Sequence, residues 1–275
     1  ALGAFTFSFL AALFIYWAGL IGIVILLAFA IFFVFKAQSI HKERDKKKKR
    51  TEEKFIAVAE LKGEGITHSC RDNVSAIIIS LSKLYYLVIT GLKNEDRKLL
   101  KKTIKDIKDL NLQTKDLKNN VYSILKGLDD ATMEAGQYYV QVLDYLREAA
   151  HCLTYLSEPI FKHIDNNHKP LRTVQKNYLT ALNEEISTFF NFILDTVKKD
   201  KFDAIDEIVE KQQLILDQLK KLRKKQVKMI RKEEAGTRIS LLYFNTLGET
   251  KNLVLNTVNI LKAQRDFINQ VEKKF

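Results

Sequence analysis

Residues that break helices are scarce in this chain. Only two prolines, Pro159 and Pro170, and ten glycines occur in 275 residues. Leu, Ile, Lys and Glu, which are common in long helices, are abundant instead. A protein built on sheets needs many turns, and turns draw heavily on glycine and proline, so this composition argues against a sheet. It predicts an all-α protein.

Cysteines and catalytic motifs are equally scarce. Cys70 and Cys152 are the only cysteines, too few for the disulfide framework of a small secreted domain, which favours a reducing compartment. The chain lacks the strings GxxxxGK(S/T), GxGxxG, HExxH, GxSxG and CxxC. His151 precedes Cys152 directly, and neighbours on a helix diverge by about 100°, so the two do not form a nucleophile–base pair. We therefore predict that the protein is not an enzyme.

Charge is absent from the first 35 residues, and Lys36 ends this apolar stretch. About 20 apolar residues already cross a bilayer, so we predict a transmembrane segment over residues 1–35. One helix of this length would measure about 52 Å, too long for a straight crossing. Tyr16 and Trp17 fit an interfacial belt, which places the crossing at residues 18–35 and leaves residues 1–15 as the end of a preceding hydrophobic element. One long tilted helix is the alternative.

The apolar stretch does not resemble a signal peptide. It has no basic region before it and no small-residue cleavage site, and it is longer than the apolar core of a signal peptide. We expect the chain to be the C-terminal part of a longer membrane protein.

A basic linker follows over residues 36–54, with nine Lys or Arg and four Asp or Glu. Its densest part is Lys46, Lys47, Lys48, Lys49 and Arg50. Lys and Arg beside a crossing remain on the cytoplasmic side and are attracted to anionic lipid. We predict that these five residues lie at the membrane surface, with the remaining domain in the cytoplasm. A basic run in this position does not indicate nucleic acid as a partner.

The polar remainder, residues 55–275, predicts a bundle of six helices. We expect a kink at Gly63 and Gly65, a stop at Gly127 and a bend at Pro159. The expected helices cover about 52–92, 94–125, 129–164, 171–198, 201–232 and 237–273.

The six helices divide into two sets of three. An offset of 101 residues places Ile78 on Leu179 and Leu143 on Phe244, and the agreement extends over three successive helix pairs. This predicts two repeats, at about 55–168 and 169–275. The alternative is that any two amphipathic helices agree in part, because 101 residues are close to a whole number of turns.

A resemblance to a known family rests on the third helix. Residues 146–153, which read LREAAHCL, and residues 155–161, which read YLSEPIF, resemble the third helix of a repeat in the PhoU-like domain. Such domains are often fused behind inorganic phosphate transporters, and this chain is most similar to the PiT type. The resemblance implies phosphate as the transported substrate, a symport mechanism, an upstream transporter domain as partner and a possible homodimer.

The resemblance also implies a metal-binding motif on the third helix of each repeat. The family motif has an acidic residue where this chain has His151 and Asn252. What remains is Glu148 with His151, and Glu249 with Asn252, each pair on one helix face. Glu with His suits a divalent or transition metal, whereas Glu with Asn is a poor site. Side chains that only hydrogen-bond one another are the alternative.

These observations predict the C-terminal part of an inorganic phosphate transporter, whose cytoplasmic PhoU-like bundle regulates transport. Two alternatives remain open. One is a membrane-anchored signalling receptor with a helical coiled coil, and the other is a structural tether with no role in transport.

Overall fold

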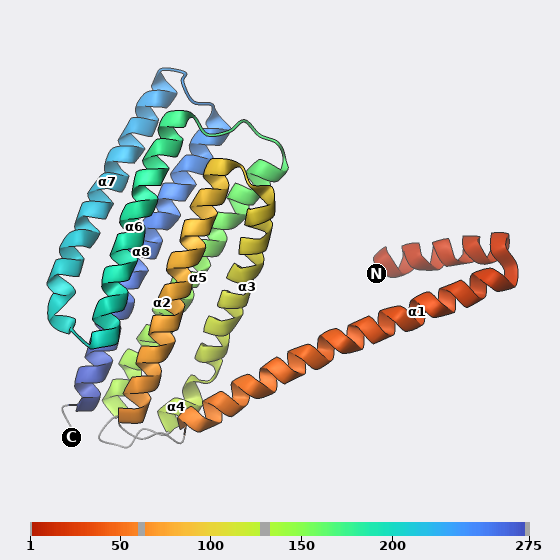
Figure 1. Ribbon diagram of the computed structural model, residues 1–275, viewed down its shortest axis with the longest axis horizontal. Helices are drawn as coiled ribbons and strands as arrows, with labels where there is room; N and C mark the ends of the chain where they lie inside the picture. Colours follow the sequence, from red (N-terminus) through yellow and green to blue (C-terminus); the bar gives the residue numbers. More distant parts are fainter. Residues whose placement is uncertain (1, 60–63, 127–132, 273–275) are drawn as a thin grey trace. The chain divides into compact units, whose positions relative to one another are not determined.

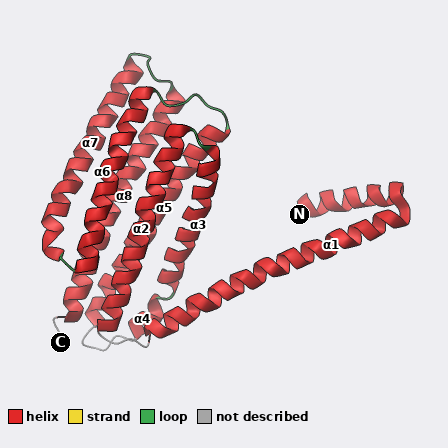
Figure 2. Cartoon of the chain, viewed as in Figure 1, coloured by secondary structure: helices red, strands yellow, loops and turns green. Residues whose placement is uncertain are grey.

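The computed structural model describes residues 2–59, 64–126 and 133–272. All secondary structure in these ranges is helical, and no strand occurs in them (Figure 2). The all-α prediction is therefore confirmed. The chain divides into two compact units, Ala1–Phe55 and Ile56–Phe275.

The first unit consists of helix α1 (Leu2–Ala59), which is broken at Gly19. Gly19 has φ 56° and ψ −139°, a conformation that glycine adopts readily because it has no Cβ. Figure 1 shows the chain turning back sharply in this red part of α1. The apolar stretch is thus two helical segments, and a single straight helix over residues 1–35 does not form.

Two helices in the described ranges are long and apolar enough to cross a membrane. Ile21–Ser39 has a mean hydropathy of 2.4 and is 6% buried, whereas Gly65–Asn94 has a mean hydropathy of 1.6 and is 56% buried. The second is the central helix of the bundle, and core helices of soluble domains satisfy the same criterion. Length and composition therefore favour Ile21–Ser39 as the crossing, slightly later than the predicted residues 18–35.

The expected helix over residues 52–92 is described in two parts. Helix α1 is described to Ala59 and α2 from Glu64, and residues 60–63 between them lie outside the described part. Gly63 lies outside the described residues, and Gly65 lies inside α2. The five predicted membrane-surface residues, Lys46–Arg50, belong to the α1 backbone, but their side chains lie outside the described part.

The second unit is a bundle of antiparallel helices joined by short connections (Figure 1). Helices α2, α5 and α7 run in one direction, and α3, α6 and α8 run in the other. The elements are α2 (Glu64–Asn94), α3 (Arg97–Asn119), α4 (Val121–Lys126), α5 (Met133–Asp165), α6 (Thr173–Lys199), η1 (Phe202–Ala204), α7 (Ile205–Arg231) and α8 (Thr237–Glu272).

Local sequence signals explain several helix ends. Asp96 caps α3 by accepting a hydrogen bond from the backbone N–H of Leu99 at 2.9 Å. Asn120 ends α3 earlier than expected, so the short α4 forms the rest of the predicted 94–125 helix. Pro159 stays inside α5, as predicted. The predicted stop at Gly127 lies outside the described residues.

The helix contacts have the symmetry that two repeats require. Exchanging α2, α3 and α5 for α6, α7 and α8 converts the α3–α5 contact into α7–α8, α2–α3 into α6–α7, and α2–α5 into α6–α8, all of which occur. The pairs α2–α6 and α5–α8 convert into themselves. The contact of α2 with α8 is the exception, because its equivalent, α5 with α6, is not comparably extensive in the described part of the chain. The two sets of three helices therefore pack around an approximate pseudo-twofold axis.

The register of the repeats differs from the predicted offset of 101. Helices α2 and α6 end 105 residues apart, at Asn94 and Lys199. Their buried positions coincide at the same offset, for example Val74 with Leu179 and Leu92 with Val197. Buried positions of α5 and α8 coincide at 104: Tyr139 with Tyr243, Leu146 with Thr250, Leu153 with Thr257 and Ile160 with Gln264. Offsets of 101 and 105 differ by about one helical turn, so a pattern of apolar residues cannot separate them.

Candidate functional site

All four predicted metal-ligating residues lie where α5 packs against α8. These helices are antiparallel, and polar contacts join them along their length. Asn245 donates to the Tyr155 carbonyl at 3.1 Å, and Gln270 donates to Glu134 at 3.0 Å. The interface therefore presents side chains of both repeats to one another.

In the first predicted pair, Glu148 with His151, the His151 side chain already contacts other residues of α5. His151 accepts a hydrogen bond from Arg147 Nε at 3.3 Å, and its ring stacks on Tyr155 with 6.3 Å between centroids. Glu148 is exposed one turn away. A metal could use the Glu148 carboxylate, but binding through His151 Nε2 would first displace Arg147.

The second predicted pair is hydrogen-bonded to itself. Asn252 donates to Glu249 Oε2 at 3.3 Å. At the structural offset of 104, Asn252 corresponds to Glu148, not to His151 as an offset of 101 implied. The two pairs therefore do not occupy equivalent places in the repeats, and this part of the sequence interpretation is corrected.

Cys152 lies at the centre of this interface. Its Sγ accepts from Asn256 Nδ2 at 3.7 Å, and at an offset of 104 these two residues are equivalents that meet across the pseudo-twofold axis. Burial raises the pKa of the Cys152 thiol to about 12, and the nearby carboxylates of Glu249 and Glu148 add to the effect. The thiol thus stays protonated near neutral pH, which does not favour a nucleophile or a thiolate ligand.

A complete metal site is not formed by the part of the chain that the structure describes. No group of three or more His, Cys, Asp or Glu side chains in these ranges is arranged to hold an ion. Glu148 and Glu249 both lie close enough to Cys152 to influence its thiol, although they are not equivalent positions at the offset of 104. Metal binding by these residues stays a prediction.

His163, His168 and Arg238 form a cluster at the end of the bundle where α5 leads into α6. The Nε2 of the buried His163 forms a hydrogen bond with the Lys169 carbonyl oxygen at 2.9 Å. The His163 ring packs edge-on against the His168 ring, with 5.3 Å between the ring centroids. Arg238, from the start of α8, lies 3.0 Å from His168 Nε2. Desolvation lowers the pKa of His168 below its usual 6.5, and Arg238 and His163 lower it further.

This cluster predicts a loss of stability in acid. Because the folded protein holds the pKa of His168 below its unfolded value, unfolding takes up a proton as the pH falls through about 6.5. Neutral His168 therefore contributes fully to the stability of the folded protein above this pH, and this contribution is lost as the pH falls below it. We expect His168→Gln to reduce the drop in melting temperature between about pH 8 and about pH 5. The control is His68→Gln on α2, where the exposed ring lies 3.6 Å from Asp72 and not beside a cation. An equal acid-induced drop in wild type and His168→Gln would contradict the prediction.

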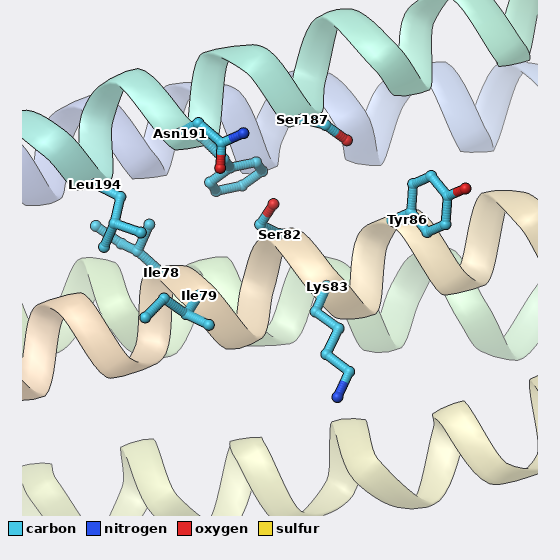
Figure 3. A pocket seen from close by; sticks show the side chains of 9 residues that line it. Ile78, Ile79, Ser82, Lys83, Tyr86, Ser187, Asn191 and Leu194 are labelled. Atoms are coloured by element: carbon cyan, nitrogen blue, oxygen red, sulfur yellow. The ribbon is translucent and has the colours of Figure 1, made fainter.

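Two open grooves lie on the bundle surface. The first, of about 270 Å³, runs between α2 and α6. In Figure 3, Ser82 and Asn191 face one another across it, while Lys83 points away from α6. The second, of about 390 Å³, lies between α3 and α5. It is lined by Lys101, Lys108 and Lys162, by Glu158, and by the apolar Ile104 and Phe161. The first offers weak polar groups, and the second offers positive charge.

Comparison with known proteins does not assign the chain to a family. No family model matches it, and no curated protein is similar enough to count as a match. The resemblance to PhoU-like domains therefore stays an expectation from the sequence.

Proposed function

We propose that the chain is the C-terminal part of an inorganic phosphate transporter and that its helical bundle regulates transport. The observation that carries the proposal is the exchange symmetry of two three-helix sets behind an apolar helix. A tandem three-helix architecture is what the resemblance to PhoU-like domains implies. The LREAAHCL phrase in α5, at the interface between the two sets, adds to this support.

In this proposal the bundle acts by differential packing. A domain that binds one conformation of the transporter more tightly than another shifts the equilibrium between them by that difference in affinity. The bundle lies in the cytoplasm and contacts the cytoplasmic face of the transporter or a second bundle. It has no catalytic role.

The test uses the full transporter with and without its bundle. Ending the protein after Ala59 removes the second unit and keeps the apolar helix and the basic linker. We expect phosphate uptake per transporter in the membrane to change, and its dependence on external phosphate to be lost. The amount of inserted transporter, measured through a common tag, is the control. Uptake that is unchanged at both low and high phosphate would contradict the proposal.

The alternatives differ in what they require of the bundle. A coiled-coil receptor needs a long continuous rod, whereas the described helices of the second unit pack side by side (Figure 1). A structural tether would leave uptake unchanged when the bundle is removed. The truncation experiment therefore also separates regulation from tethering.

A further inference from the structure

The second half of α7 carries an unusual concentration of positive charge. Residues 220–232 contain eight Lys or Arg and no Asp or Glu. All eight are exposed, and none forms an ion pair with a carboxylate that the structure describes. Lys225 lies over the Tyr178 ring at 4.1 Å. The eight residues are Lys220, Lys221, Arg223, Lys224, Lys225, Lys228, Arg231 and Lys232.

This charge breaks the symmetry of the bundle. At the offset of 105, four lysines at the start of α3 correspond to four carboxylates in η1 and at the start of α7. The equivalents are Lys98 with Asp203, Lys101 with Asp206, Lys102 with Glu207, and Lys105 with Glu210. Because α3 and α7 run in opposite directions, the reversal gathers the basic halves of both helices at one end of the bundle (Figure 1).

Contacts confirm that these segments share an end. Arg97 at the start of α3 pairs with Asp165 at the end of α5, and Lys176 at the start of α6 pairs with Glu95 at 2.8 Å. Lys225, near the end of α7, meets Tyr178 of α6. Like charges gathered in this way repel one another, and a polyanionic partner would relieve the repulsion.

Apolar side chains lie among the lysines. Val227 is 48% exposed and Ile230 is 40% exposed. The buried side of α7 is formed by residues such as Leu219, Leu222 and Gln226, so Val227 projects from the outward side together with Lys220, Lys224 and Arg231. Basic residues around an exposed apolar residue are the pattern of helices that lie at a membrane interface.

We propose that the outward face of residues 220–231 in α7 docks on the surface of an anionic lipid bilayer. This occupant is favoured because the same chain carries the apolar Ile21–Ser39 helix, which keeps the bundle within reach of a bilayer. Neither of the two grooves described above lies on α7, so the face offers charge and apolar contact without a shaped pocket. The proposal depends on the membrane anchor but not on phosphate transport.

The test places a probe on the proposed contact. The full chain is reconstituted in vesicles, with Val227→Cys labelled by an environment-sensitive fluorophore. Both native cysteines are buried, which limits labelling elsewhere. The matched control is Leu214→Cys, at a position that is 66% exposed in the acidic half of the same helix. Quenching by brominated lipid should be at least about twofold stronger in phosphatidylglycerol vesicles than in pure phosphatidylcholine for the label at Val227, but not for the label at Leu214. About 1 M salt should abolish the difference.

Charge reversal provides a second test. Replacing Lys220, Lys224 and Lys228 by glutamate (K220E, K224E and K228E) should remove the lipid-dependent quenching at Val227. The same change at Lys98, Lys102 and Lys105 of α3, which share this end but not the docking face, should weaken the quenching less. All six lysines are exposed, and melting curves would establish that both variants fold. A label at Val227 that is not quenched, or is quenched equally in both lipids, overturns the proposal. Protection of that unquenched label by polyglutamate would assign the face to an acidic protein. None of these readouts depends on phosphate uptake, so this proposal and the transport proposal can fail separately.

Discussion

Replacing Gln226 by methionine should lower the free energy of unfolding by about 2–4 kcal/mol, because two buried hydrogen bonds lose their shared partner. Gln226 lies in a buried chain of polar groups that joins α6, α7 and α8. Gln175 Nε2 donates to Gln226 Oε1 at 2.8 Å, and Gln226 Nε2 donates to Ser240 Oγ at 2.9 Å. Methionine would keep the volume but leave the Gln175 amide without its acceptor.

Replacing Gln264 by methionine should have the opposite effect and raise the free energy of unfolding. Gln264 is fully buried in α8, and neither its Oε1 nor its Nε2 has a hydrogen-bond partner in the described part of the chain. An unpartnered buried amide costs about 1–3 kcal/mol. We expect Gln264→Met to raise the free energy of unfolding by an amount of this order.

Chemical denaturation of the full chain in detergent or nanodiscs measures both variants on the same scale. Each variant is the matched control of the other, because residue type, burial and replacement are identical and only the hydrogen bonding differs. Equal destabilisation by the two substitutions would show that Gln264 also has a partner in the folded protein. The expected stabilisation by Gln264→Met would then be wrong, whereas an unchanged free energy of unfolding in Gln226→Met would contradict the hydrogen bonds at Gln226.

Replacing Gly91 by alanine should lower the free energy of unfolding by about 1–3 kcal/mol through overpacking. A Cβ on Gly91 would lie 2.7 Å from Leu100 Cγ and 2.8 Å from Leu100 Cδ2. Leu100 is fully buried on α3, so its side chain has little space to move. The gain in helix propensity from alanine, up to about 1 kcal/mol, offsets only part of this cost.

A double-mutant cycle separates this clash from other effects. Leu100→Ala alone should cost about 2–5 kcal/mol because it leaves a cavity. In the double variant, the methyl group added by Gly91→Ala enters that space, so the total loss should be smaller than the sum of the two single losses. Gly236→Ala is the control, since a Cβ there meets no atom within 4 Å. Strict additivity at Gly91 and Leu100 would contradict the close approach of α2 and α3.

The sequence alone predicted those features of the fold that depend on neighbouring residues. The expected helices over about 171–198, 201–232 and 237–273 lie close to α6, α7 and α8. Their causes, helix-forming residues and few helix breakers, act over a few neighbouring residues and need no distant partner. The all-α class follows from the same kind of signal.

The features that the sequence did not predict correctly depend on contacts between residues far apart in the sequence. A shift of four residues keeps nearly the same helix face, so the apolar pattern could not distinguish the offset of 101 from 104 or 105. That shift misaligned Glu148 with Glu249 and hid the meeting of Cys152 with Asn256. The partners of Gln226 lie on other helices, and the sequence gives no sign that Gln264 lacks them.

The absence of a side chain at Gly19 allows the backbone of the apolar N-terminal stretch to turn there. Any L-residue with a Cβ would pay about 1–3 kcal/mol to hold the backbone at φ 56° and ψ −139° found there. The bend would then tend to open into one continuous helix. The number of helical segments in the apolar stretch thus depends on this one glycine.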